Sequence, residues 1–242
     1  MKNNKMQYGT WCQIAHPAIG EILAKSGFDF VTLDCEHGEA ENGDIANFCR
    51  AVHGGGAKAL IRVMENSTLA IRRALDLGAD GVIVPLVESA GEARRAVAAA
   101  TYPPAGIRGF AWHNGNDYGE KFTEYAENFK PQVMVMCESI KAVENMKEIA
   151  AVDGVDGIVI GPYDLSGSMG IPGKTGDPRV VEACAKAAEA CIAAGKAAGF
   201  HIVTPTEENI QCSIDQGYTF LALGMDTHFL QAGAKAVKGL IR

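Results

Sequence analysis

Carboxylate side chains stand at the ends of several short apolar runs in this sequence of 242 residues. Asp34 ends one such run, and Glu138, Asp164 and Asp226 end three others. An apolar strand that ends in a carboxylate is costly unless the charge is paired or bound to a metal. Glu138 and Asp164 end neighbouring runs, and two carboxylates without a soft ligand suit Mg²⁺ or Mn²⁺. The alternative, which the spacing leaves open, is that each acid caps a helix or pairs with a base.

Two further side chains at these run ends have types that could act on a small anion. Arg62 ends the run at 58–63, and its planar fork suits a carboxylate, although a structural ion pair with Asp34 or Glu36 is an equal alternative. His37 follows Asp34 and Glu36 in a turn bounded by glycine. It could act as a general base near neutral pH, whereas a lone histidine is more often structural.

Lysine and cysteine chemistry is not favoured by the same pattern. Lys58 lies at the opposite end of its run, and no other lysine ends a run, which disfavours a Schiff base. The seven cysteines form no CxxC pair, so we expect reduced, mostly buried thiols and no zinc site, with Cys137 turned away from the interior. His113 lies in a long polar and aromatic segment, where we assign it a surface role only.

The elements that must position these residues form a repeat. Short apolar runs alternate with Ala-rich helical stretches, and near-continuous apolar strands are typical of a parallel sheet buried on both faces. The expected strands are 8–15, 28–36, 58–63, 81–87, 132–138, 157–162, 199–205 and 220–226. The expected helices are 17–26, 67–77, 89–99, 139–151, 177–194 and 206–216, with 110–129 an inserted loop and short helix. Eight units of roughly 30 residues predict one (β/α)8 TIM barrel domain of α/β class over 1–242, with its site at the C-terminal strand ends.

Composition excludes several classes of partner. Hydrophobic residues make up 48% of the chain, which favours a large core. Lys and Arg number 22 against 29 Asp and Glu, a net charge of −7 that disfavours nucleic acid and anionic membranes. No apolar run approaches the ~20 residues of a membrane span, and the start, Met1 to Met6, lacks the apolar segment of a secretory signal. No GxGxxG motif follows an expected strand, so the sequence does not support a dinucleotide-binding domain. We therefore expect a cytoplasmic protein that acts on small molecules.

Motifs along nearly the whole chain resemble one family. They are Gly9-Thr10-Trp11, Gly27-Phe28-Asp29-Phe30, Asp34-Cys35-Glu36-His37-Gly38, Ile61-Arg62-Val63, Ala74-Leu75-Asp76-Leu77-Gly78-Ala79, Tyr102-Pro103-Pro104-Ala105-Gly106-Ile107-Arg108-Gly109, Gly161-Pro162-Tyr163-Asp164-Leu165-Ser166 and Gly224-Met225-Asp226-Thr227. In this order they resemble the HpcH/HpaI aldolase family, the metal-dependent class II pyruvate aldolases of the phosphoenolpyruvate/pyruvate barrel superfamily. The set is specific for the family but not for one substrate.

The resemblance implies an activity and a role for each site residue. It implies reversible retro-aldol cleavage of a 4-hydroxy-2-oxo acid to pyruvate and an aldehyde, through a metal-stabilised pyruvate enolate, in a homo-oligomer and specifically a hexamer. Glu138 and Asp164 would bind Mg²⁺ or Mn²⁺, with Co²⁺ a further candidate, and Arg62 would hold the 2-oxo acid. His37 would be the base, with Asp76 orienting it from a neighbouring subunit. The substrate site would be completed by Trp11, Gly161, Pro162 and Tyr163.

Two positions depart from the family pattern. The family commonly has Gln two residues before the metal-binding Glu, and here that residue is Met136, so one polar substrate contact is missing. Tyr163 occupies a position that is often small, which narrows the expected pocket. Two alternatives stand beside the aldolase. One is an oxaloacetate-type decarboxylase of the same superfamily, which also makes a metal-bound pyruvate enolate. The other is a metal and 2-oxo-acid binding protein without turnover, which Met136 suggests.

Overall fold

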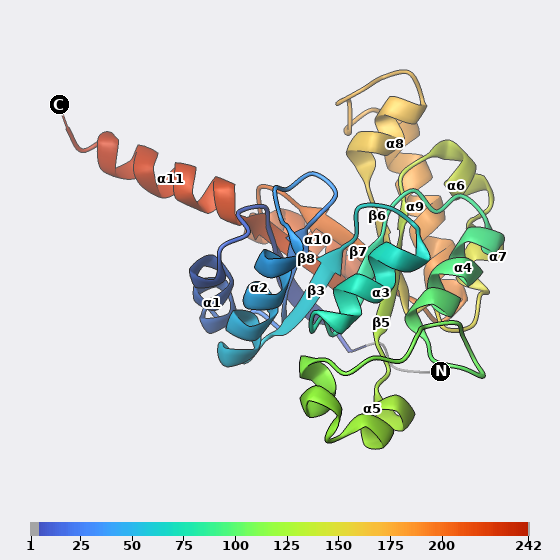
Figure 1. Ribbon diagram of the computed structural model, residues 1–242. Coiled ribbons are helices and arrows are strands. Elements are labelled where there is room, and N and C mark those ends of the chain that lie inside the picture. Colours follow the sequence, from blue (N-terminus) through green and yellow to red (C-terminus); the bar gives the residue numbers. More distant parts are fainter. Residues whose placement is uncertain (1–4, 242) are drawn as a thin grey trace.

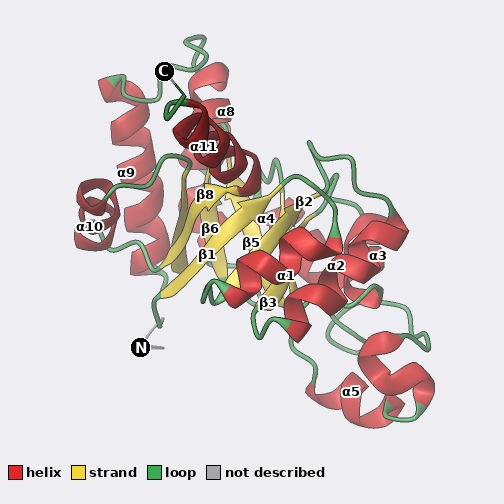
Figure 2. Cartoon of the chain, turned by 90° about the vertical axis from the view of Figure 1, so that its left-hand side faces the viewer, coloured by secondary structure: helices red, strands yellow, loops and turns green. Residues whose placement is uncertain are grey.

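The computed structural model describes residues 5–241, and its centre is a closed barrel of parallel strands. Residues 1–4 and 242 lie outside the described residues. They include both ends of the domain predicted over 1–242 and most of the segment from Met1 to Met6. The strands are β1 (Gln7–Cys12), β2 (Phe30–Asp34), β3 (Lys58–Arg62), β4 (Gly81–Val84), β5 (Gln132–Cys137), β6 (Gly157–Ile160), β7 (Ala197–Ile202) and β8 (Phe220–Met225). Each pairs with the next in the chain, and β8 closes on β1. The predicted (β/α)8 barrel is confirmed (Figure 2).

Most of the covering helices lie where the sequence predicts them. These are α1 (Pro17–Lys25), α3 (Thr68–Asp76), α4 (Ala90–Ala100), α9 (Pro178–Ala193) and α10 (Glu207–Asp215). The inserted segment contains the short 3-10 helix η1 (Asn114–Gly119) and α5 (Phe122–Asn128), which lie outside the ring of helices (Figure 1). The single helix predicted over 139–151 is instead two, α6 (Ile140–Glu144) and α7 (Met146–Ala150). They meet at Asn145, whose side-chain amide donates to the Glu88 carbonyl (2.8 Å).

Three helices were not predicted. They are α2 (Asn42–Gly54), α8 (Pro162–Ser168) and α11 (Asp226–Lys238). The buried residues of α2 are Ile45, Phe48, Cys49 and Val52. Their helical spacing is visible in the sequence, where polar residues separate them, and could have predicted this helix. The α8 and α11 helices begin directly at strand ends, and therefore Asp164 and Asp226 lie in first helical turns rather than in strands.

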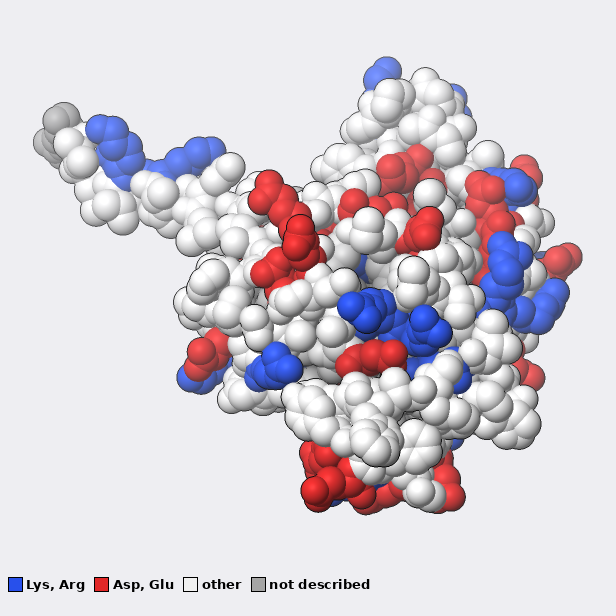
Figure 3. Space-filling view, viewed as in Figure 1, with Lys and Arg blue, Asp and Glu red and all other residues white. Residues whose placement is uncertain are grey.

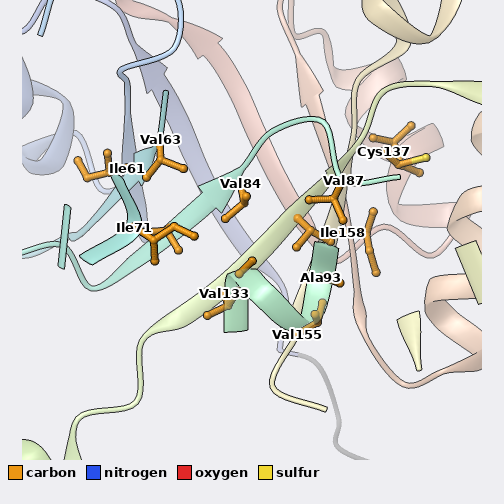
Figure 4. Close-up of a cluster of buried hydrophobic side chains, with 14 of the residues drawn as sticks. Ile61, Val63, Ile71, Val84, Val87, Ala93, Val133, Cys137, Val155 and Ile158 are labelled. Atoms are coloured by element: carbon orange, nitrogen blue, oxygen red, sulfur yellow. The ribbon is translucent and has the colours of Figure 1, made fainter. Parts of the chain in front are cut away.

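The core has two layers separated by the strands. Inside the barrel, the Phe30 and Phe220 rings stack at 4.2 Å, and a Cβ on Gly9 would lie 2.3 Å from the Phe30 ring, so this position requires glycine. Outside, aliphatic side chains fill the space between strands and helices (Figure 4). Cys137 belongs to this outer layer, as predicted from strand alternation. Six of the seven cysteines are buried, which confirms their predicted packing role.

The α11 helix is the exception to the compact covering of the barrel. It packs against β1 and β8 at its start and then projects away from the barrel (Figure 1). Its apolar side chains Phe229, Leu230 and Val237 are exposed, and Lys235 and Lys238 lie in its last turn (Figure 3). Among residues 5–241, no helix combines the length and apolar character needed to cross a membrane.

Candidate active site

A cavity of about 210 Å³ lies at the C-terminal mouth of the barrel and gathers most of the predicted site residues. Its lining includes Trp11, His37, Arg62, Glu138, Gly161, Pro162, Tyr163 and Asp164. Asp76 does not line it. A larger cavity of about 640 Å³ lies between α9 and α10, but Arg62 and Glu138 do not reach it. We place the candidate site in the smaller cavity because the charged groups converge there.

The Arg62 guanidinium is the buried cation of this site. It ends β3 at 7% exposure and is in contact with carboxylates from three positions. Its Nη2 pairs with the Glu36 carboxylate and lies 3.1 Å from Glu138 Oε1, while Nη1 lies 3.4 Å from Asp34 Oδ2. The structural ion pairs left open by the sequence are therefore present. The Nε–H is buried and has no hydrogen-bond partner within residues 5–241, so one donor of the guanidinium is unsatisfied.

Asp34 organises the turn that carries His37. Its Oδ1 accepts from the backbone amides of Glu36 and His37, each at 3.1 Å, and its Oδ2 accepts from Trp11 Nε1 at 3.1 Å. A Cβ on Gly38 would lie 2.2 Å from the Asp34 carbonyl oxygen, so the turn closes only with glycine. The His37 side chain is 57% exposed, with Nε2 at 3.9 Å from the Glu36 carboxylate. The turn thus holds an accessible imidazole beside the cavity.

Glu138 is a buried carboxylate held by the loop after β4. Its Oε2 accepts from the Leu86 backbone amide at 3.0 Å, and Leu86 has a positive φ of 53°, which is uncommon for a residue with a side chain. A Cβ on Gly161 would lie 2.9 Å from Glu138 Cγ, so glycine makes room for this carboxylate. Burial raises the pKa of Glu138, the Arg62 charge opposes this, and Glu36 and Asp164 raise the pKa further.

The donor set at the mouth fits a hard divalent cation. Asp164 lies exposed in the first turn of α8, close enough for its charge to raise the pKa of Glu138. Asp34, Glu36 and Glu138 contact one guanidinium and Asp164 adds a fourth carboxylate nearby, so negative charge is in excess, and these four groups offer only oxygen ligands. Within residues 5–241, no group of three or more His, Cys, Asp or Glu is arranged as a metal site. A cation would therefore need water or substrate oxygens to complete its shell.

The backbone at Gly161, Pro162 and Tyr163 offers fewer donors than the sequence suggests. The Gly161 amide donates to the Cys137 carbonyl at 3.0 Å, which continues the sheet, and proline has no amide hydrogen. Of the three, only Tyr163 keeps an amide that is free of bonds to described residues, at the start of α8. The Tyr163 side chain is exposed and lines the cavity.

Asp76 lies outside the cavity in an ion pair that the sequence analysis missed. Its Oδ1 accepts from Arg108 Nη2 at 2.9 Å, and the Arg108 side chain is fully buried. The guanidinium lies over the rings of Tyr102, Tyr125 and Phe129, with its Cζ 4.6, 5.8 and 5.5 Å from their centroids. Within one chain, Asp76 therefore forms an ion pair with Arg108. Its orientation of a neighbouring subunit's His37 stays a prediction.

The surface role assigned to His113 is wrong. The residue is 7% exposed, because the inserted segment folds onto its own aromatic side chains and Tyr125 meets the imidazole edge-on at 5.0 Å. Its Nδ1 accepts from the Gly115 amide at 3.1 Å, and its Nε2 lies 3.9 Å from Asp76. Burial lowers the pKa of His113, with Asp76 opposing and Arg108 adding to the shift. His113 is thus a neutral packing residue beside the Asp76–Arg108 pair.

One histidine that the sequence analysis left unassigned also lines the cavity. His201 lies on β7 in alternation with Ala197, which belongs to the inner layer, and its ring stacks on Trp11 at 5.1 Å with 14° between the planes. Strand alternation could have placed His201 inside the barrel. The predicted strand, however, ran from 199 to 205, whereas β7 ends at Ile202, so His201 was not recognised as one of the last inward residues of the strand.

Comparisons with known proteins agree with this architecture. The sequence model described as HpcH/HpaI aldolase/citrate lyase matches residues 7–232. The chain is 36% identical to a 5-keto-4-deoxy-D-glucarate aldolase of Klebsiella pneumoniae subsp. pneumoniae, covering 92% of this chain and 87% of that protein. It is 35% identical to a 4-hydroxy-2-oxovalerate aldolase of Rhodococcus jostii, with 98% and 92% covered. A crystal structure of an HpcH/HpaI aldolase/citrate lyase family protein from Burkholderia cenocepacia superposes with a TM-score of 0.93 at 27% identity, over 100% and 96% of the chains.

The Asp76–Arg108 pair leads to a stability prediction. Asp76→Asn leaves a buried guanidinium without its carboxylate, so we expect the free energy of unfolding to fall by about 3–5 kcal/mol, as when one partner of a buried pair is removed. Denaturant unfolding followed by circular dichroism measures the change. The matched control is Glu21→Gln, which breaks the exposed pair with Lys25 on α1 and should change little. An Asp76→Asn protein that unfolds at the wild-type midpoint would contradict the structural role of the pair.

Proposed function

This chain belongs to the HpcH/HpaI aldolase/citrate lyase family, and we propose that it is a metal-dependent aldolase. It would cleave a 4-hydroxy-2-oxo acid reversibly to pyruvate and an aldehyde. The observation that carries the proposal is the convergence of Arg62, Glu138, Asp164 and His37 on one cavity at the mouth of the barrel. Active sites of this fold lie at that end of the strands. The aldolase names of its relatives support the class of reaction, a carbon–carbon lyase.

The candidate metal ligands are Glu138 and Asp164. Both are carboxylates at the mouth, and the surplus of negative charge around them favours a divalent cation such as Mg²⁺, Mn²⁺ or Co²⁺. When bound, the metal would supply positive charge at the 2-oxo oxygen of the substrate. Arg62 already touches Glu138 and so orients this carboxylate from the barrel side.

Arg62 is the residue that we assign to the pyruvyl half. The residue lines the cavity, and its planar guanidinium suits the carboxylate of a 2-oxo acid. The guanidinium is held on three sides, so it would not need to reorganise as charge develops on the 2-oxo oxygen. Arg62 should therefore matter more in the transition state than in the ground state.

His37 is the residue that we assign to proton transfer. Its imidazole is half exposed, so it can exchange a proton with solvent, and its backbone is fixed by Asp34. In cleavage it would take the proton of the 4-hydroxyl, directly or through water, and return it in the reverse reaction. Trp11 and Tyr163 would form walls of the substrate pocket, and the Tyr163 amide would donate to the substrate carboxylate.

We also propose that the chain works as a homo-oligomer, with a hexamer expected from the family resemblance. The projecting α11 helix supports this, because it exposes Leu230, Val237 and part of the Phe229 ring. A second copy would bury these side chains. It would also bring an Asp76 toward a His37, which a single chain does not do.

The first test asks for the chemistry and the metal together. In D₂O with pyruvate and Mg²⁺ or Mn²⁺, we expect deuterium to enter pyruvate C3, observed by NMR, and EDTA to abolish the exchange. Borohydride should not inactivate the enzyme, because no lysine lines the cavity within the described residues. A protein that binds 2-oxo acids without turnover would show no exchange. Trapping of a lysine–pyruvate adduct would move the chain out of the metal-dependent class.

A binding measurement tests Glu138 and Asp164 as metal ligands. Glu138→Ala and Asp164→Ala should each lose affinity for Mn²⁺ in calorimetric titration, whereas Asp215→Ala, an acid on the exposed side of α10, should bind as the wild type. Unchanged affinity in either site variant would move the ligand elsewhere.

A second prediction concerns Arg62→Lys. Lysine keeps the charge but lacks the planar fork, so we expect metal binding to remain and kcat to fall on the order of a hundredfold or more, as for loss of one oxyanion donor. Steady-state kinetics and thermal unfolding are measured on one preparation. A variant with near-normal kcat and a lower melting temperature would show that Arg62 only neutralises Asp34, Glu36 and Glu138.

A third prediction concerns assembly. Light scattering of active samples should give a multiple of the 25.6 kDa chain, and Leu230→Asp on α11 should shift the mass toward the monomer. Ile192→Asp, an exposed apolar position on α9, is the control and should not change the mass. An active monomer of wild type would remove the role of Asp76 in a neighbour's site.

A further inference from the structure

The wall of the cavity opposite Arg62 is formed by β7, β8 and β1. In a closed barrel of eight strands in sequence order, β7 stands across from β3, and β1 across from β5. His201 on β7 therefore faces the side that carries Arg62, and Trp11 on β1 faces the side that carries Glu138. A substrate held by its 2-oxo acid end at Arg62 and Glu138 would direct its other end toward His201 and Trp11.

The His201 ring is fixed in position and in tautomer. It stacks on Trp11, and its Nε2 lies 3.0 Å from the Gly224 carbonyl oxygen. Because a carbonyl only accepts, Nε2 carries the hydrogen. The same oxygen accepts from Thr10 Oγ1 at 3.2 Å, and Gly224 adopts a positive φ of 66° that turns its carbonyl into this position.

The imidazole is also neutral, so its second nitrogen is an acceptor. Burial lowers the pKa of His201; the Gly224 carbonyl and Asp34 oppose the shift, and Arg62 and His228 add to it. With the hydrogen on Nε2, the neutral ring has a lone pair on Nδ1. This Nδ1 has no hydrogen-bond partner within residues 5–241. It is also not one of the unpartnered polar atoms that are fully buried in that part of the chain, so it keeps some accessible surface. His201 lines both the smaller cavity and the larger one between α9 and α10, and its Nδ1 is an acceptor held by a rigid ring at the wall that they share.

The other side chains nearby do not supply such an acceptor. Met136, Val203 and Met225 line the cavity with apolar or weakly polar groups. Gln13 also lines it, but no hydrogen bond to a described residue fixes its side-chain amide. A preorganised acceptor beside largely apolar side chains is the arrangement that discriminates a hydroxyl from a methyl group.

We propose that His201 selects the aldehyde half of the substrate by accepting a hydrogen bond at Nδ1 from a hydroxyl on the carbon next to the aldehyde carbon. This rests on the proposed aldolase function. Short hydroxyaldehydes are then the preferred acceptors, since the cavity of about 210 Å³ leaves room for few atoms beyond pyruvate. His201 thus supplies on β7 a polar substrate contact that Met136 does not supply on β5.

The experiment compares two aldehydes of nearly equal size. Glycolaldehyde and propanal differ by a hydroxyl in place of a methyl group, and each is condensed with pyruvate and Mn²⁺ while kcat/KM is measured. We expect the wild type to prefer glycolaldehyde by at least about tenfold. His201→Leu, which removes the acceptor at similar volume, should bring the ratio close to one. His201→Asn, which places an amide oxygen near the Nδ1 position, should restore part of the preference.

Controls keep the outcomes distinct. His53→Leu removes an imidazole at the other end of the barrel, where it contacts Asp80, and should keep the wild-type ratio. If His201→Leu does not fold, His201→Met tests the same loss of the acceptor. A wild-type ratio near one, or a ratio unchanged in the apolar variants, would overturn the proposal while C3 exchange into pyruvate continues. Absence of that exchange in the wild type would instead overturn the aldolase function and the role of His201 with it.

Discussion

The contact of one guanidinium with three carboxylates determines how the mouth of this barrel is built. Arg62 brings together Asp34 at the end of β2, Glu36 in the following turn and Glu138 after β5. These groups would repel one another without it, and burial already raises the pKa of Glu36 and Glu138 against the opposing charge of Arg62. Buried ion clusters of this kind contribute little net stability, because desolvation offsets attraction. Their presence at the cavity is therefore better explained by chemistry than by folding.

The backbone around this cluster is adapted to it at a small number of positions. Gly38 and Gly161 leave out a Cβ that would collide with the Asp34 carbonyl and with Glu138. Leu86 holds a positive φ so that its amide reaches Glu138. Each adaptation has a local cost in strain or in chain entropy, and each sets the position of one carboxylate. The carboxylates are thus placed by the backbone as well as by Arg62.

The sequence predicted the parts of this arrangement that depend on local pattern. Apolar runs marked the eight strands, and a closed parallel barrel brings all their C-terminal ends together. Arg62, His37, Glu138 and Asp164 could therefore be grouped from the sequence alone. Contacts between distant segments could not be read in this way. Arg108 lies 32 residues from Asp76, and nothing local shows that the two meet. The neutral burial of His113 depends likewise on how residues 110–129 fold back on themselves.

The inserted segment and the projecting helix lead to one conclusion about the site. Residues 102–129 surround Arg108 with aromatic rings, and Arg108 fixes Asp76 at the end of α3, outside the chain's own cavity. An aspartate held this firmly is well prepared to orient an imidazole, but the only histidine it approaches among the described residues of its chain is His113, whose pKa is lowered by burial. If Asp76 is to orient His37, a second chain must bring that histidine to it. The exposed apolar face of α11 gives such a chain a surface to cover, so in this enzyme assembly would complete the site as well as bury apolar area.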